Sequence, residues 1–162
     1  VHPERVLGLV LIAPVPASDF PVPLEMAKAW CDTQHDRIAA FKTILAPFTK
    51  IPVKRELTEL FLDDFAKAAR IGLEETLNIC GLSFIEQAKK IGVPTLVLAG
   101  SYDPLLTPDM LKSTILAQIA GARIVTLPCG HEISQEMPEQ TAALLEAFLS
   151  GAGHARAIDV AA

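Results

Sequence analysis

Three short runs along the chain consist almost entirely of apolar residues, at positions 6–13, 96–99 and 122–128. The first two runs are apolar at every position. Such runs are typical of strands that are buried on both faces of a parallel sheet, with helices packed on each side. We therefore predict one strand for each run and expect helices between them.

Between residues 24 and 90 the apolar positions instead follow a helical period, and this stretch contains no convincing strand. Asp32 is the predicted N-cap of the second helix, and Gly81 is a predicted break. The predicted helices cover 24–31, 34–48, 54–70 and, as one or two pieces, 73–90. The clearest apolar helix face is formed by Leu57, Leu60, Phe61, Phe65 and Ala68.

Two further helices are predicted around the third strand. Thr107 is the expected N-cap of a helix that has Pro108 at its first position, and Gly121 ends that helix. The last helix covers 138–149. The order of strand, helical stretch, strand, helix, strand, helix is typical of a parallel sheet in an α/β fold.

The chain is therefore expected to divide into four segments. Residues 1–18 form a core strand and its following loop, where prolines carry the chain away from the sheet. Residues 19–91 form a helical cap, or lid, inserted between strands. Residues 92–150 form the C-terminal core of strand, helix, strand and helix. Residues 151–162 are mostly small and are predicted to be a flexible tail.

Composition narrows the class of protein. Half of the residues (51%) are hydrophobic and the net charge is −5 with scattered lysine and arginine, so nucleic acid is an unexpected partner. No apolar run reaches the roughly 18 residues of a membrane span. Three distant cysteines, Cys31, Cys80 and Cys129, are typical of reduced thiols, so we expect a cytoplasmic protein.

An acid and an imidazole follow the second and third strands. Asp103 comes just past 96–99, and His131 comes just past 122–128. A single crossover helix places these strands side by side, with both carboxyl ends at one edge of the sheet. The two side chains are expected to meet there. A carboxylate on one imidazole nitrogen fixes the tautomer and leaves the other nitrogen as a base.

Other interpretations of these residues are disfavoured. Asp103 precedes a proline, which also suits a plain turn. Cys129 lies two residues before His131, but both belong to one short loop and no helix end supports a thiolate. The histidines and cysteines lack metal-ligand spacing, so no metal or other cofactor is expected. Glu136 is expected to cap or orient the last helix rather than transfer a proton.

Three segments resemble the C-terminal part of an α/β-hydrolase-fold enzyme. VHPERVLGLVLIAP resembles the segment that leads into the sixth strand of that fold, and VPTLVLAGSYDPLLTPDML resembles the strand and loop that present the acid. GHEISQEMPEQTAALLEAFL resembles the histidine loop and the closing helix. Together they cover roughly a third to two-fifths of the chain, and the helical insertion between them has no specific match.

The resemblance implies that Asp103 is the acid and His131 the base of a catalytic triad, in the family's order of nucleophile, acid and histidine. The family's nucleophile elbow, G-x-S-x-G, is absent, and none of the six serines has its context. We therefore expect an N-terminal fragment or partner chain to supply a serine nucleophile and the oxyanion hole.

The expected activity is hydrolysis of a small hydrophobic carboxylic ester. The leading candidates for the acyl pocket are Trp30, Phe41, Phe61 and Tyr102, and Phe48 and Phe65 could also line it. The five that belong to the helical insertion equally suit packing within the lid. Relatives with the same acid and histidine include epoxide hydrolases, dehalogenases, C–C hydrolases and perhydrolases, so these activities are alternatives. A non-catalytic, hydrolase-like binding module is another.

Overall fold

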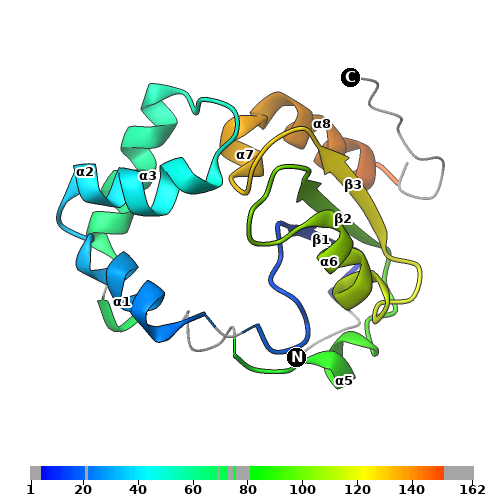
Figure 1. Ribbon diagram of the computed structural model, residues 1–162. Helices are drawn as coiled ribbons and strands as arrows, with labels where there is room; N and C mark the ends of the chain where they lie inside the picture. Colours follow the sequence, from blue (N-terminus) through cyan, green and yellow to red (C-terminus); the bar gives the residue numbers. More distant parts are fainter. Residues whose placement is uncertain (1–4, 21, 69, 73–74, 76–80, 152–162) are drawn as a thin grey trace.

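The protein has an α/β architecture with a parallel sheet (Figure 1). The computed structural model describes residues 5–20, 22–68, 70–72, 75 and 81–151. The strands lie in the order β1-β2-β3, which confirms the predicted parallel sheet. The strands are β1 (Leu9–Ile12), β2 (Thr95–Gly100) and β3 (Arg123–Leu127).

Helices make up most of the other described residues. Those between β1 and β2 are α1 (Leu24–Asp32), α2 (Arg37–Ala40), the π-helical turn η2 (Phe41–Leu45), the 3₁₀ turn η3 (Ala46–Phe48), α3 (Arg55–Lys67) and α5 (Ile85–Ala88). Those after β2 are α6 (Pro108–Leu111), the π-helical turn η4 (Lys112–Leu116), α7 (Ile133–Glu136) and α8 (Pro138–Leu149).

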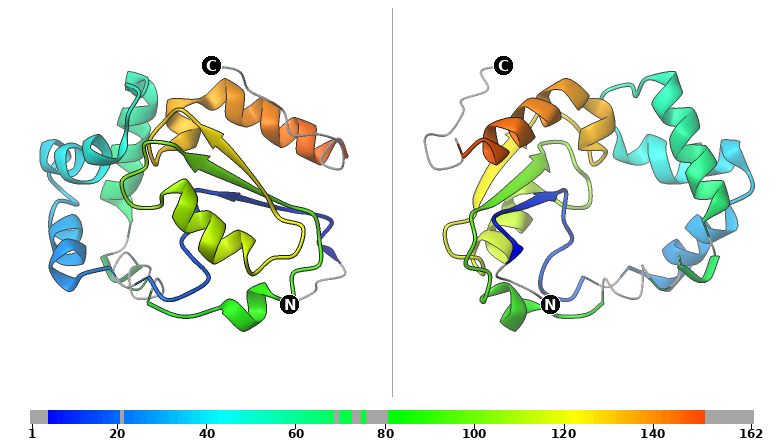
Figure 2. Two further views of the ribbon diagram at one scale, coloured as in Figure 1. Left: turned by 45° about the vertical axis from the view of Figure 1, so that its right-hand side comes forward. Right: turned by 180° about the vertical axis from the view of Figure 1, so that it is seen from behind.

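The middle strand, β2, joins two hydrophobic cores. All six of its residues are buried, and their side chains alternate between the two faces of the sheet. Val97 and Ala99 belong to the core that includes α6 and η4, while Leu96 and Leu98 belong to the core that includes α7 and α8. Each buried aliphatic side chain stabilises the fold by about 1.5–3 kcal/mol. Helices thus cover both faces, as Figure 2 shows.

The first strand differs from the prediction of a strand buried on both faces. Its residues are half-buried or exposed, and Ile12 is 39% exposed. The reason is its place at the edge of the sheet, where no described strand pairs with its outer side. The strand is also shorter than 6–13. It begins at Leu9 and ends before Ala13, which has a left-handed backbone with a φ of 42°.

The helical insertion between β1 and β2 lies beside the sheet, and the carboxyl ends of the strands point toward it (Figure 2). The prediction of Asp32 as an N-cap is wrong. Asp32 ends α1 and pairs with Arg70 at 2.9 Å, whereas Asp36 caps α2 by accepting the Ala39 N–H at 3.0 Å. Asp36 is the residue directly before the helix, where a cap oxygen reaches the free N–H groups.

Polar side chains hold the insertion together. Arg37 of α2 forms ion pairs with Asp63 and Glu59 of α3. The Gln34 side-chain amide donates to the backbone carbonyls of Phe65 and Ala68 at the end of α3. The exposed ion pairs contribute little individually, about 0–1 kcal/mol each. Buried Gln34 is the firmer link, and it joins the turn between α1 and α2 to the end of α3.

The helix after β2 starts at its predicted position but ends at Leu116, before the predicted stop at Gly121, and α7 was not predicted. Thr107 caps α6 through the Met110 N–H at 3.3 Å, and Pro108 is its first residue. The helix then widens into η4 instead of continuing as a regular α-helix. Gly121 follows with a φ of 77°, a conformation that suits glycine. The last helix, α8, has the predicted bounds.

Some predictions fall outside the described residues. They include residues 73–74 and 76–80 of the predicted helical stretch 73–90, and the tail beyond residue 151. The four segment boundaries stay predictions. Within the described ranges, no helix has the length and apolar character needed to cross a membrane.

The loops after β2 and β3 run side by side beyond the strands. The Ser101 N–H donates to the Leu127 carbonyl at 2.8 Å, and the Tyr102 N–H donates to the Cys129 carbonyl at 3.0 Å. Gly100 permits this approach, because a methyl group there would overlap the carbonyl oxygen of Gly130. The pairing of the two strands is thereby extended toward the residues that follow them.

This contact leads to a stability prediction. Gly100→Ala should lower the free energy of unfolding by about 1–3 kcal/mol, because backbone must move to admit the methyl group. Gly92→Ala is the control, since a Cβ there meets nothing within 4 Å. It should be neutral or stabilise by up to about 1 kcal/mol. Urea unfolding measures both, and equal stability of the two variants would contradict the proposed close approach.

Candidate active site

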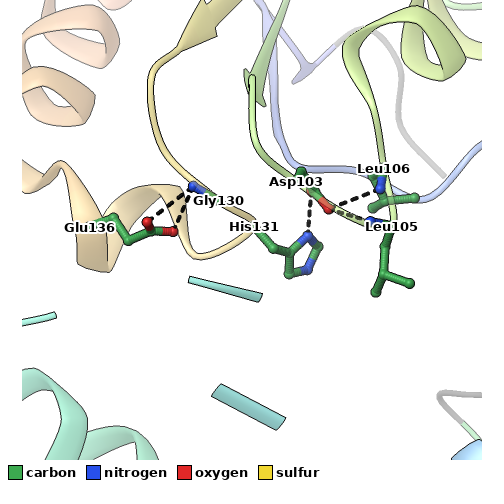
Figure 3. A network of polar contacts seen from close by, with 6 residues as sticks. All are labelled: Asp103, Leu105, Leu106, Gly130, His131 and Glu136. Carbon is green, nitrogen blue, oxygen red and sulfur yellow. Dashed lines mark hydrogen bonds and ion pairs between the residues drawn. The ribbon is translucent and has the colours of Figure 1, made fainter. Parts of the chain in front are cut away.

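Asp103 occupies a buried turn directly after β2. It is 3% exposed, and its Oδ1 accepts the backbone N–H groups of Leu105 and Leu106 at 2.8 and 2.9 Å. Its own N–H donates to the Gly100 carbonyl at 3.3 Å. These contacts hold one carboxylate oxygen in the turn and leave Oδ2 directed at the neighbouring loop (Figure 3).

His131 lies on that neighbouring loop, four residues past β3. Its Nδ1 is 2.8 Å from Asp103 Oδ2. An ionised carboxylate only accepts hydrogen bonds, so Nδ1 carries the hydrogen and Nε2 is left with a lone pair. The ring is partly exposed, at 27%, whereas the Asp103 side chain is fully buried. Figure 3 shows Nε2 pointing away from the carboxylate.

The pair shifts the pKa of both groups. Burial by itself would raise the pKa of Asp103, but hydrogen bonds from His131, Leu106 and Leu105 outweigh it and lower that pKa. Burial would lower the pKa of His131, but the Asp103 hydrogen bond and nearby negative charges raise it. The Asp103 contribution to stability is therefore lost as pH falls through its lowered pKa. The His131 contribution is complete below about pH 6.5 and is lost as pH rises through the raised pKa.

A second buried carboxylate, that of Glu136 at the end of α7, binds the backbone of the histidine loop. Its oxygens accept the Gly130 N–H at 3.0 Å and the N–H groups of Lys50 and Ile51 at 2.6 and 2.7 Å. The His131 N–H donates to the Phe48 carbonyl at 2.6 Å. Four backbone N–H groups and the Phe48 carbonyl thus attach the histidine loop to residues 48–51, at the end of η3 and just after it.

Burial also shifts the pKa of two other groups of this loop. Burial, with the charges of Glu136 and Asp103, raises the pKa of the Cys129 thiol to about 12, so it stays protonated at neutral pH. Burial also raises the pKa of Glu132, and Glu136 adds to this effect. Within the described ranges, no cluster of His, Cys, Asp or Glu could hold a metal ion.

The four leading candidates for the acyl pocket have different surroundings in the structure. Trp30 packs edge-on against Phe48 at 5.9 Å, and Phe48 in turn lies 6.3 Å from the His131 ring. Tyr102 is exposed beneath the Lys50 ammonium, 5.0 Å from its ring centre. Trp30 is therefore separated from His131 by the Phe48 ring, whereas Tyr102 lies on the Asp103 loop itself.

The other two candidates have different surroundings. Phe61 stacks on Phe65 within α3 at 6.4 Å, which agrees with packing inside the insertion. Phe41 is 41% exposed, and no ring contact connects it to His131. Phe48, a further candidate, lies beside the His131 ring. Lys50 was not among the candidates, because only the folded backbone brings residues 48–51 to the histidine loop.

A titration tests the pairing of Asp103 with His131. In the Asp103→Asn variant, the pKa of His131 should fall below the wild-type value, because the largest raising contact is lost while burial still disfavours the charged ring. Asp109→Asn, which removes an exposed carboxylate on α6, should leave the pKa of His131 unchanged. NMR of the imidazole protons against pH measures both. Equal pKa values in the two variants would show that the pair does not form in solution.

The chain is similar in sequence to one kind of curated protein and similar in fold to several solved structures. No protein-family model matches the chain. Monoacylglycerol lipase ABHD6 of Bos taurus is 31% identical over 103 residues, which cover 62% of this chain and 27% of the relative. The chain thus spans about a quarter of the length of this curated relative.

Solved structures match over most of the chain. An esterase from Exiguobacterium antarcticum has a TM-score of 0.75 and 18% identity, over 90% of this chain and 58% of that one. The α/β-hydrolase MGS-M2 from a Medee basin metagenome library has a TM-score of 0.68 and 19% identity, over 92% and 58%. A hydrolase from Pseudomonas aeruginosa PA01 has a TM-score of 0.68 and 27% identity, over 91% and 57%. With the parallel sheet, these matches show that the chain has the fold of the C-terminal part of an α/β-hydrolase.

Proposed function

We propose that the protein is a hydrolase that cleaves carboxylic esters by acyl transfer. In this proposal His131 is the general base, Asp103 orients it, and a serine outside this chain is the nucleophile. The observation that carries the proposal is the 2.8 Å contact between His131 Nδ1 and Asp103 Oδ2, on a ring whose Nε2 points away from the carboxylate. Esterases and a lipase among the similar proteins support the same chemistry.

The geometry suits the proton transfers of ester hydrolysis. His131 Nε2 would take the proton of the attacking serine and return it to the leaving alcohol, and water would then remove the acyl group by the same route. Three hydrogen bonds outweigh the effect of burial and keep Asp103 ionised, so it can stabilise the imidazolium that forms. Such general base catalysis typically contributes about 10²–10⁴ in rate.

The nucleophile is assigned to another segment or chain because no serine here fits the role. Among the described residues, no serine hydrogen-bonds to the His131 ring. The free edge of β1 supports a strand as the carrier. Exposed apolar residues lie along or beside that edge, including Leu7, Ile12 and Val15, and a paired strand would cover them. A parallel strand there would end at the same edge as Asp103 and His131.

The helical insertion is proposed to act as a lid over the reacting ester. It lies on the side toward which the strands point. Its Phe48 packs against the His131 ring, and Trp30 packs against Phe48. An apolar wall beside the base favours a small or medium hydrophobic acyl or alcohol group over a charged one.

Activity measurements test the role of His131 in the protein assembled with its nucleophile-bearing part. His131→Ala should lower kcat for a p-nitrophenyl ester by about a thousandfold or more, because proton transfer to and from the serine is lost. The control is His35→Ala, which removes an exposed histidine of the insertion and should keep wild-type kcat. Full activity of the His131→Ala variant would refute the proposal.

Covalent labelling tests the nucleophile itself. A fluorescent alkyl phosphonate should label the assembled protein on one serine, and peptide mass mapping should place that serine outside residues 1–162. The His131→Ala variant should be labelled far more slowly, since the serine loses its base. Absence of labelling in the assembled wild type would instead favour a non-catalytic module.

A further inference from the structure

We propose that Glu136 is a positioning residue that fixes the His131 base by holding the helical insertion against the histidine loop. This inference rests on the proposed role of His131. The insertion segment concerned is Phe48–Ile51, which we name the strap. Glu136 does not touch the reacting atoms. It acts through the backbone of Gly130, which precedes His131, and through the backbone of the strap.

The first step is the set of hydrogen bonds to Glu136. The side chain is buried, with the residue 7% exposed, and both of its oxygens are occupied. Oε2 accepts Lys50 N–H and Ile51 N–H at 2.6 and 2.7 Å, and the Gly130 N–H lies 3.0 Å from both oxygens. One carboxylate therefore joins residues 86 positions apart in the chain. Three charge-assisted hydrogen bonds on one group make this a strong attachment.

The second step is how the strap touches the base. The Phe48 carbonyl accepts the His131 N–H at 2.6 Å, and the Phe48 ring packs edge-on against the imidazole. The strap also contacts the loop that carries Asp103, because the Lys50 ammonium lies over the ring of Tyr102 in that loop. The strap thus contacts both loops of the pair.

The third step is the close packing around the Gly130 Cα. A methyl group there would overlap the Phe48 carbonyl oxygen and lie 2.9 Å from Glu136 Oε1 and 3.0 Å from Lys50 N. The strap, the glycine and the carboxylate are therefore in direct contact, and a shift of one moves the others. Since Gly130 directly precedes His131, the position of the strap sets the backbone from which the imidazole projects (Figure 3).

The predicted consequence is a link between the insertion and the base. With the strap attached, the ring is held between Asp103 and Phe48. With the strap released, His131 loses the backbone hydrogen bond and the aromatic neighbour, and only Asp103 orients it. A displacement of about 1 Å in a reacting group can cost on the order of a hundredfold in rate.

Glu136→Gln is the informative substitution because it keeps the shape of the side chain. The amide retains one oxygen for the Lys50 and Ile51 N–H groups, but its nitrogen can only donate and would face the Gly130 N–H. We expect kcat for a p-nitrophenyl ester to fall about tenfold, with KM changed by less than about twofold. Glu136→Ala, which removes all three hydrogen bonds, should lower kcat by about a hundredfold.

The matched control is Glu139→Gln. Glu139 forms an ion pair with Lys54 at 3.2 Å, so it also joins α8 to the stretch after the strap, but both side chains are exposed. The same loss of charge at this place should leave kcat and KM at wild-type values. A fall in kcat equal to that of Glu136→Gln would overturn the proposal, because it would assign the effect to charge and not to the strap.

Two measurements separate a positioning role from a merely structural one. In the Glu136→Gln variant, the His131 ring protons should shift and the Lys50 and Ile51 amides should exchange with solvent about tenfold faster, while the β2 amides keep their rates. In the wild type, the Lys50 and Ile51 amides should exchange far more slowly than exposed loop amides. If the wild-type Lys50 and Ile51 amides exchanged as fast as exposed loop amides, the proposal would be overturned, even if Glu136→Gln and Glu136→Ala both failed to fold.

The outcomes also separate this inference from the proposed function. If Glu136→Gln kept wild-type kcat and unchanged amide exchange while His131→Ala was inactive, the positioning role of Glu136 would be refuted and the catalytic role of His131 would stand. Full activity of His131→Ala would refute the catalytic role, while slowed exchange at Lys50 and Ile51 would still support attachment by Glu136.

Discussion

Two buried carboxylates at the carboxyl edge of the sheet are the constraint on which the site depends. Asp103 and Glu136 each accept three hydrogen bonds, all but one from backbone N–H groups. A buried charge without such partners costs several kcal/mol, so the loops that provide the donors must stay ordered. Order in these loops therefore follows from the desolvation of two acidic side chains, and the position of His131 between them follows from the same cause.

Much of the core could be predicted from the sequence, for reasons that are specific to parallel sheets. A middle strand such as β2 is buried on both faces and leaves an uninterrupted apolar run, so its position was evident. The crossover from β2 to β3 leaves few topologies, and this placed Asp103 and His131 at one edge. The α8 helix was located by Pro138 and its apolar face.

The remaining features depend on contacts that leave no local pattern. Asp32 and Asp36 are both acceptable caps, and the choice between them depends on where α1 ends. The half-exposed state of β1 reflects the lack of a described neighbour, which its apolar sequence does not reveal. The attachment of Glu136 uses the backbone N–H groups of Lys50 and Ile51, and every residue other than proline has such a group.

The sequence separations within the site have a consequence for how the protein folds. Asp103 and His131 are 28 residues apart, within a single strand–helix–strand unit, whereas Lys50 and Glu136 are 86 residues apart. Closing the longer loop costs more chain entropy, and contacts of high sequence separation tend to form late. The acid and the histidine should thus meet early in folding, and docking of the insertion should complete the native state afterwards.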